Sequence, residues 1–139
     1  NDNDTIGGGL DADYLYGEAG NDVIYASYGG DYLSGGAGTD TMFGGDGNDT
    51  IVGGTGDDTM YGGFGNDVFV IEANSGADAI GGFFSLGSDR IDLSALNLNG
   101  MSDLTISQDG ADVLIEFGGS SIRLFNATET NLDSTDFIF

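Results

Sequence analysis

An aspartate recurs every nine residues through the first half of the chain, at Asp4, Asp13, Asp22, Asp31, Asp40, Asp49, Asp58 and Asp67. Carboxylates are hard oxygen ligands, and irregular turns that also offer backbone carbonyls suit Ca²⁺ better than the strictly octahedral Mg²⁺. Carboxylates stacked at a strand spacing of about 4.8 Å repel one another unless a cation lies between them. The column therefore predicts calcium binding, and the alternative is a row of solvated turn aspartates.

A large apolar residue follows two positions after each aspartate: Ile6, Leu15, Ile24, Leu33, Met42, Ile51, Met60 and Phe69. Complete nonapeptides begin at Gly8, Gly17, Ala26, Gly35, Gly44, Gly53 and Gly62, after a truncated copy, NDNDTIG. Glycines at positions one, two and four permit a tight turn, and the residues around the apolar one form a short strand. Two repeats would close one coil with a sheet on either side, so alternate aspartates line opposite edges.

The repeat GGxGxDxUx, in which U is a large apolar residue, resembles the RTX calcium-binding nonapeptide over residues 1–70. The resemblance implies an all-β, right-handed parallel β-roll. Each ion would take two position-six carboxylates from stacked turns, carbonyls two and four of one turn and carbonyls one and three of the next. The implied carboxylate pairs are Asp4 with Asp22, Asp13 with Asp31, Asp22 with Asp40, Asp31 with Asp49, Asp40 with Asp58 and Asp49 with Asp67. About six Ca²⁺ ions follow, with one or two more at the stack ends.

The resemblance also implies a set of backbone-carbonyl ligands. They are the carbonyls of Asp2, Gly9, Asp11, Gly17, Glu18, Ala19, Gly20, Ala26, Ser27, Tyr28, Gly29, Gly35, Gly36, Ala37, Gly38, Gly44, Gly45, Asp46, Gly47, Gly53, Gly54, Thr55, Gly56, Gly62 and Phe64, with Gly63 and Gly65 as further candidates. Some positions depart from the repeat. Glu18, Ala26 and Ser27 replace a glycine at position one or two, and Asp2 and Asp11 replace it at position four.

The composition excludes most other chemistry. Among 139 residues, 24 are acidic and 2 are basic, the formal charge is −22, and His and Cys are absent. Both basic residues are arginines, Arg90 and Arg123. This excludes zinc sites of the usual kind, His-dependent triads, lysine Schiff bases, disulfides and nucleic-acid binding by phosphate neutralisation. No apolar run is long enough to span a membrane. We expect a non-catalytic module with no nucleic-acid partner and no membrane insertion.

The second half, residues 71–139, is predicted to be a β-sandwich-like, antiparallel cap on the β-roll of residues 1–70, because an open coil needs covered edges. Strands are predicted at 90–94, 104–107, 112–117, 121–125 and 137–139, with Asp109-Gly110 as a two-residue hairpin turn. GSDRIDLSAL at 87–96 resembles the segment that follows the repeats in serralysin-type metalloproteases. ADAIGGF at 77–83 is similar to their DxIxDF, with Gly82 in place of the second aspartate. Asp78, Asp89 and Asp92 are further candidate ligands, unless they are solvated strand-end residues.

The chain ends on TDFIF, which is similar to the C-terminal signal that type I secretion exporters read in that group. The sequence begins within a repeat, which suggests an upstream domain that carries any catalytic or adhesive activity. Both features predict a bacterial protein that is secreted without an N-terminal leader.

Two groups of aromatic residues recur at outward positions. Tyr25, Phe43 and Tyr61 are spaced by 18 residues, and Tyr14, Tyr16 and Tyr32 fall on the opposite sheet. Such rows can stack a sugar chain or dock a partner. The alternatives are a cross-strand ladder that stabilises the sheet or a surface that a neighbouring domain covers.

Three functions remain open. We favour a calcium-responsive C-terminal domain, unfolded in the cytosol for export by a type I exporter and folded outside, where it stabilises its upstream passenger. One inward apolar side chain per repeat buries little area, so we expect metal ligation to decide folding. The second reading is a polysaccharide-binding module like the R-modules of alginate epimerases. The third is a surface-layer or adhesin segment that self-associates in calcium.

Overall fold

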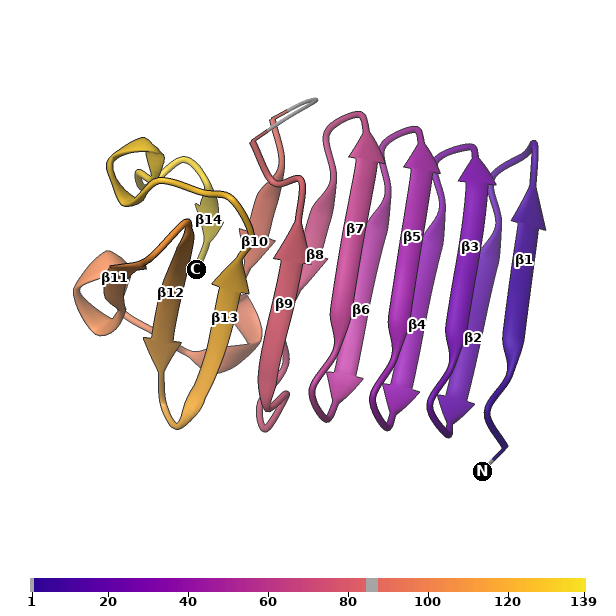
Figure 1. The fold of residues 1–139 in the computed structure, drawn as a ribbon, viewed down its shortest axis with the longest axis horizontal. Coiled ribbons are helices and arrows are strands. Elements are labelled where there is room, and N and C mark those ends of the chain that lie inside the picture. The colour runs from indigo at the N-terminus through magenta and orange to yellow at the C-terminus, as the bar shows by residue number, and fades with distance from the viewer. Residues whose placement is uncertain (1, 85–87) are drawn as a thin grey trace.

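The computed structural model describes residues 2–84 and 88–139. Its first eight strands begin nine residues apart, as the repeat predicts: β1 (Thr5–Gly9), β2 (Tyr14–Ala19), β3 (Val23–Tyr28), β4 (Tyr32–Ala37), β5 (Thr41–Asp46), β6 (Thr50–Thr55), β7 (Thr59–Phe64) and β8 (Val68–Val70). Successive strands belong to alternate sheets, and each strand pairs in parallel with the strand two places along the chain. The chain therefore winds as a flattened coil (Figure 1), and the predicted parallel β-roll is confirmed.

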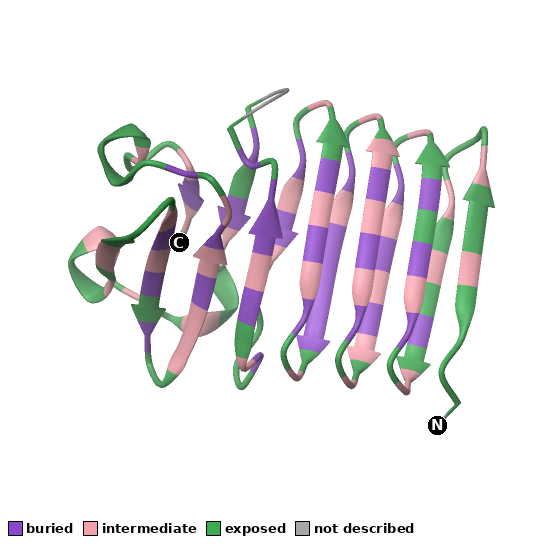
Figure 2. Ribbon diagram, in the orientation of Figure 1, coloured by how far each residue is buried: buried purple, intermediate pink, exposed green. Residues whose placement is uncertain are grey.

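The apolar column of the repeat fills the interior of the coil. Leu33 is in register with Leu15 on one side and Ile51 on the other, so the column stacks from turn to turn. The column members from Ile24 to Phe69 have no exposed surface, whereas Ile6 and Leu15 in the first turn are only partly buried. Figure 2 shows the result as buried segments that recur along the strands of both sheets.

Both sheets continue into the second half of the chain. Its elements are β9 (Ala77–Gly81), β10 (Arg90–Asp92), η1 (Ser94–Leu96), η2 (Met101–Asp103), β11 (Thr105–Asp109), β12 (Asp112–Phe117), β13 (Ser120–Leu124), η3 (Glu129–Asn131) and β14 (Phe137–Ile138), where η marks a single 3₁₀ turn. The eight-stranded sheet has the order β1-β3-β5-β7-β9-β13-β12-β11, and the six-stranded sheet β14-β10-β8-β6-β4-β2. Parallel pairing thus extends past residue 70, and the domain boundary at that residue stays a prediction.

The cap is antiparallel where β11, β12 and β13 pair, as expected for a fold that ends its coil with hairpins. Each of the five strands predicted in this half corresponds to a strand, and β9 is an addition. The predicted hairpin turn is wrong by one residue: Asp109 pairs with Asp112, so the turn is Gly110-Ala111. Gly110 has a φ of 66°, which suits glycine at the first turn position. Asn1 and Gly87, which belong to two of the sequence motifs, lie outside the described residues.

Candidate calcium-binding ladders

The repeat aspartates form two ladders, one along each edge of the coil. In each ladder, Oδ1 of an aspartate accepts a hydrogen bond from the backbone N–H of the aspartate one turn earlier, at 2.7–2.9 Å. The structure brings together all six predicted pairs: Asp4/Asp22, Asp13/Asp31, Asp22/Asp40, Asp31/Asp49, Asp40/Asp58 and Asp49/Asp67. The register arises because each turn has the same length, so position six always falls above position six.

The second carboxylate oxygen in these ladders is buried and has no partner. This holds for the Oδ2 atoms of Asp22, Asp31, Asp40, Asp49, Asp58, Asp67 and Asp78. All seven side chains are at most 3% exposed. A buried acceptor without a partner costs about 1–3 kcal/mol, and more if it is charged. A repeated row of such atoms fits a row of bound cations.

Backbone carbonyls complete the donor set. A Cβ added to Gly36 would meet Glu18 O, and one added to Gly38 would meet Gly20 O, so carbonyls two and four of one turn face the next turn. Asp22 Oδ2 and Gly35 O both lie within 2.6 Å of the point where a Cβ of Gly17 would sit. Oxygen atoms therefore crowd the space beside this glycine. Among the complete repeats, Ala26 alone carries a Cβ at this position.

The same pattern holds at most of the predicted carbonyls. Carbonyls two and four of the earlier turn face the next one at Asp2, Asp11, Glu18, Gly20, Ser27, Gly29, Gly36, Gly38, Gly45 and Gly47. The position-three carbonyls of Ala37, Asp46, Thr55 and Phe64 turn back and accept the N–H of a position-four glycine one turn earlier, at 2.8–3.0 Å. Among the described residues, no three acidic side chains converge on one point, so these carbonyls would have to supplement two carboxylates.

The two departures at position two keep the turn geometry of the repeat, whereas Asp11 at position four lacks the positive φ of the glycines there. Glu18 and Ser27 replace glycine at position two, yet they have φ values of 73° and 87°. These values lie in the left-handed region that costs a non-glycine residue about 1–3 kcal/mol. The tertiary structure therefore imposes the turn on these two residues.

Burial raises the pKa of the ladder carboxyls in the later turns of the coil. The pKa of Asp49 and of Asp58 rises to about 6, because burial disfavours the charged form and neighbouring aspartates repel it. Burial raises the pKa of Asp40 and Asp67 as well. Carboxyls that are difficult to ionise without a counter-charge are suited to a bound cation.

Asp78 and Asp89 continue the two ladders beyond the repeats. Asp78 Oδ1 accepts the N–H of Asp58 at 3.1 Å, and Asp89 Oδ1 accepts that of Asp67 at 3.0 Å. Burial raises their pKa values to about 7 and about 6. Asp92 is not part of either ladder, since its Oδ1 accepts the N–H of Ser94 within the same segment.

The turn before Asp78 reproduces a repeat turn that the sequence analysis did not identify. Asn74 has the positive φ of position two, at 66°, and Ser75 O accepts the N–H of Gly56 as a position-three carbonyl. Gly76 lies against Gly56 O as a position-four glycine does. The sequence signal was SGAD, which matches the xGxD of the repeat after a two-residue insertion. Part of the corresponding turn before Asp89, which Gly63 and Gly65 would face, lies outside the described residues.

A second side-chain ladder stands beside the aspartates at position five. Asn3 Oδ1 accepts the N–H of Asn21, and Asn21 Oδ1 accepts that of Thr39, both at 2.9 Å. Asn48 and Asn66 repeat the contact on the other edge at 2.9 Å. The recurring Asn-Asp pairs in the sequence were the available signal. These asparagines tie successive turns together without using the aspartate oxygens.

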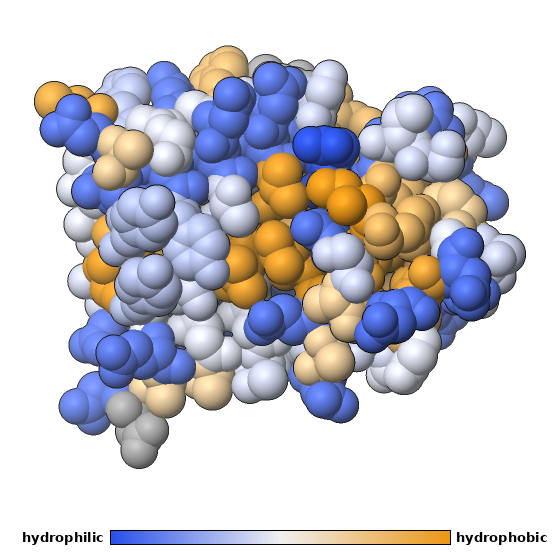
Figure 3. All heavy atoms as spheres, turned by 180° about the vertical axis from the view of Figure 1, so that it is seen from behind, coloured by the Kyte–Doolittle hydropathy of each residue, from blue (hydrophilic) through white to orange (hydrophobic). Residues whose placement is uncertain are grey.

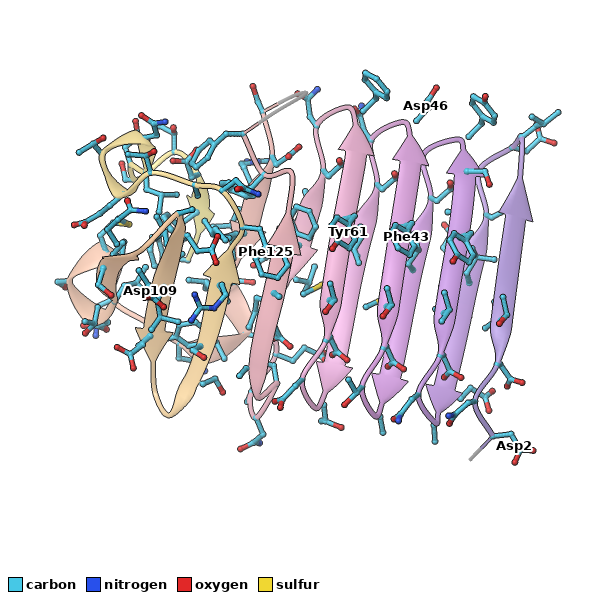
Figure 4. All side chains as sticks on the ribbon, in the orientation of Figure 1. Asp2, Phe43, Asp46, Tyr61, Asp109 and Phe125 are labelled. Carbon is cyan, nitrogen blue, oxygen red and sulfur yellow. The ribbon has the colours of Figure 1, made fainter. Side chains whose placement is uncertain are left out.

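The two aromatic groups differ in geometry. The rings of Tyr25, Phe43 and Tyr61 stack with centroids 5.0 Å apart and planes 4° apart, and Figure 4 shows Phe43 and Tyr61 side by side on the eight-stranded sheet. On the other sheet, Tyr32 lies 5.9 Å from Tyr14 and 5.8 Å from Tyr16, with planes tilted by 32° and 47°. In the first group, both faces of the Phe43 ring are therefore covered by its neighbours, whereas no ring of the second group is stacked.

Comparisons with known proteins agree with this geometry. The family model described as RTX calcium-binding nonapeptide repeat (4 copies) matches residues 1–33 and 34–69. A search of curated proteins found no match. No helix among the described residues is long and apolar enough to cross a membrane.

Three solved structures resemble the whole chain. The AlgE6R3 subunit of the Azotobacter vinelandii mannuronan C5-epimerase is 26% identical, with a TM-score of 0.65 over 94% of this chain and 80% of that one. The AlgE6R2 subunit is 23% identical, with a TM-score of 0.55 over 96% and 91%. The extracellular lipase LipA from Serratia marcescens is 18% identical, with a TM-score of 0.52 over 99% of this chain and 38% of that one. The last two show a shared fold.

Proposed function

Residues 1–69 of this chain belong to the family of RTX calcium-binding nonapeptide repeats, and from this premise we propose that Ca²⁺ converts the domain from a disordered chain into the folded β-roll. The observation that carries the proposal is the row of buried Oδ2 atoms without a partner. In the absence of a cation, these carboxylates lose water and repel one another, which penalises the folded state. With Ca²⁺ present, the same oxygens become ligands.

The six aspartate pairs of the repeats would bind six ions. Six Ca²⁺ ions would reduce the formal charge from −22 to about −10, which weakens the repulsion that opposes a compact state. Carbonyls two and four of each turn face the next turn, and carbonyl three of that next turn faces the earlier one. This arrangement supports one ion between each pair of stacked turns. Asp4 and Asp22 would bind the first ion of one edge, and Asp13 and Asp31 the first of the other.

Two more ions would lie between Asp58 and Asp78 and between Asp67 and Asp89. Asp78 Oδ2 is buried and has no hydrogen-bond partner, like the Oδ2 atoms within the repeats. The Ser75 hydroxyl lies close enough to lower the pKa of Asp78, although it makes no hydrogen bond of regular geometry. Native mass spectrometry in calcium would distinguish eight ions from six. The Asp78→Asn variant should lose one of the eight.

The folding switch is tested by far-ultraviolet circular dichroism during a calcium titration from chelator to the millimolar range, with Mg²⁺ as the control. A cooperative change from coil to β structure in Ca²⁺ alone is expected. Extracellular modules bind calcium at about 10⁻⁴–10⁻³ M, far above cytosolic levels, so the transition should fall in that range. A complete β spectrum in chelator would contradict the proposal.

This switch would serve secretion of a bacterial protein. A chain that stays unfolded in the cytosol can pass a type I exporter and then fold outside, where it stabilises an upstream domain. In the folded state, Phe137 is buried and β14 pairs with β10, so an exporter would have to read TDFIF before folding. Deletion of residues 130–139 should retain the protein in the cell. Unchanged export would refute the role of this segment.

A second candidate function is polysaccharide binding. It is favoured by the 26% identity to a subunit of a mannuronan C5-epimerase, a protein that acts on a polysaccharide. Calorimetric titration of the calcium-loaded domain with alginate and with neutral glycans tests it. If neither type of glycan releases heat, this function is excluded and the calcium switch is unaffected.

A further inference from the structure

The stacked aromatic row on the eight-stranded sheet offers little free ring surface. Each face of the Phe43 ring is covered, by Tyr25 on one side and Tyr61 on the other. The far face of Tyr61 lies against Gly81, where an added Cβ would contact the ring. Sugars bind to aromatic side chains through the ring face, and in this row only Tyr25, beside Gly7 at the β1 end, keeps an open face. The row therefore serves mainly to stabilise the sheet.

The tyrosines of the six-stranded sheet have open faces. We name Tyr14, Tyr16 and Tyr32 the tyrosine platform. Tyr14 is 74% exposed and Tyr16 is 55% exposed, and both rings are tilted against Tyr32 and are not stacked on it. All three come from neighbouring parallel strands, β2 and β4, so a rigid sheet holds them in place. Exposed aromatic rings in fixed positions are typical of binding surfaces.

The surroundings of the platform combine apolar surface with hydrogen-bond acceptors. Tyr16 is in register with Ser34, followed across the sheet by Val52 and Val70, and Figure 3 shows apolar side chains gathered on this face. Glu18 is exposed and follows Tyr16 by two residues on β2, which places a carboxylate beside the platform. A carboxylate beside open rings can accept hydrogen bonds from sugar hydroxyls while the rings pack on the C–H face.

We propose that the tyrosine platform binds a neutral polysaccharide, with pyranose rings stacked on Tyr14 and Tyr16 and hydroxyl groups bonded near Tyr32. The proposal rests on the second candidate function and assigns its ligand class and site. Charge decides for a neutral glycan. The chain has a formal charge of −22, Arg123 is paired with Asp109 and Asp112, and Arg90 lies three strands away from Tyr32 in the sheet, whereas the Glu18 carboxylate follows Tyr16 on the same strand. An acidic glycan would be repelled there.

The test uses the full chain saturated with calcium. Hexasaccharides of β-1,4-linked glucose and of β-1,4-linked mannose are titrated by calorimetry, and hexamannuronate is the acidic comparison. The variants are Tyr14→Ala and Tyr16→Ala, with Tyr25→Ala as a matched control because it removes a tyrosine from the opposite sheet. Tyr16→Phe keeps the ring and removes only the hydroxyl. Circular dichroism in calcium verifies that each variant is folded.

We expect a neutral hexasaccharide to bind, and Tyr14→Ala and Tyr16→Ala to weaken it about fivefold to tenfold, while Tyr25→Ala and Tyr16→Phe change the affinity less than twofold. Equal loss in Tyr25→Ala, or binding of hexamannuronate alone, would overturn the platform as the site but keep the polysaccharide function. No binding of any glycan would overturn both. In each of these outcomes, the calcium titration of the same samples reports independently on the switch.

Discussion

Replacement of Asp58 by asparagine should have opposite effects with and without calcium. Asp58 is 1% exposed, its Oδ1 accepts the N–H of Asp40 at 2.9 Å, and its Oδ2 has no partner. Asparagine keeps the accepting oxygen and removes the charge. The variant should therefore lose calcium affinity, and in chelator it should relieve a repulsion that disfavours the fold.

The size of each effect follows from the site. Burial raises the pKa of Asp58 from 3.8 to about 6, so its ionisation at pH 7 costs the calcium-free fold at most about 3 kcal/mol, and about 1–3 kcal/mol after solvent screening. With calcium, one site of Kd about 10⁻⁴–10⁻³ M contributes about 1.4–2.7 kcal/mol at about 10 mM free ion. Loss of one site should lower the free energy of unfolding by that amount, and loss of both sites that would share Asp58 by about twice as much.

Two measurements separate these effects. Urea unfolding in calcium gives the loss, and folding induced by trimethylamine oxide in chelator gives the gain. The control is Asp57→Asn, which removes the same charge from an exposed neighbour and keeps the oxygen that accepts the N–H of Ala77. If both variants lower the free energy of unfolding of the calcium-bound protein equally, the reasoning about the buried oxygen is refuted. The same holds if Asp58→Asn also destabilises the calcium-free fold.

Three further predictions follow from the same geometry. In chelator, lowering the pH from 7 to 5 should increase the β structure that circular dichroism detects. Asp49 and Asp78 have pKa values of about 6 and about 7 in the folded protein, so the folded protein binds protons in this range. The unfolded chain, with ordinary carboxyls, binds fewer of them, and acid therefore favours the fold. Gly54→Ala should raise the calcium concentration at the folding midpoint and lower the free energy of unfolding by at least about 1 kcal/mol, because Gly54 has a φ of 103° and lies against a carbonyl. Gly9→Ala, where the added Cβ meets open space, should keep the midpoint of the parent protein. Phe43→Ala should lower the free energy of unfolding of the calcium-bound protein, measured in urea, by about 1–3 kcal/mol, because it removes the stacking contacts with Tyr25 and Tyr61. An unchanged urea midpoint would mean that the aromatic row contributes nothing to stability.

The nine-residue period was sufficient to predict the coil and both ladders, because each turn repeats the conditions of the turn before. Prediction was less complete after Phe69, where the turns no longer have equal length. Asp78 follows its ladder neighbour by 20 residues and Asp89 by 22, so the period of 18 does not place them in the ladders. They were predicted as candidate ligands only from their own segments, although their carboxylates accept the same backbone bonds as the repeat aspartates. The stacking angles of the rings could not be read from spacing either. They depend on the rows of the sheet: Phe43 is in register with Tyr25 and Tyr61, whereas Tyr16 is in register with Ser34 and contacts Tyr32 diagonally.

The direction of the hydrogen bonds gives the coil a mechanical property. Backbone bonds between turns, the aspartate bonds and the asparagine bonds all run along the axis of the coil, from one turn to the next. A pulling force applied at the β1 end would load the bonds between the first turn and the second, and would reach the third turn only after these had broken. Extension should therefore proceed as a series of small ruptures, one turn at a time. If the proposed ions are present, each step would release the ions between the two separating turns, and the calcium concentration would set the force at which the coil unwinds.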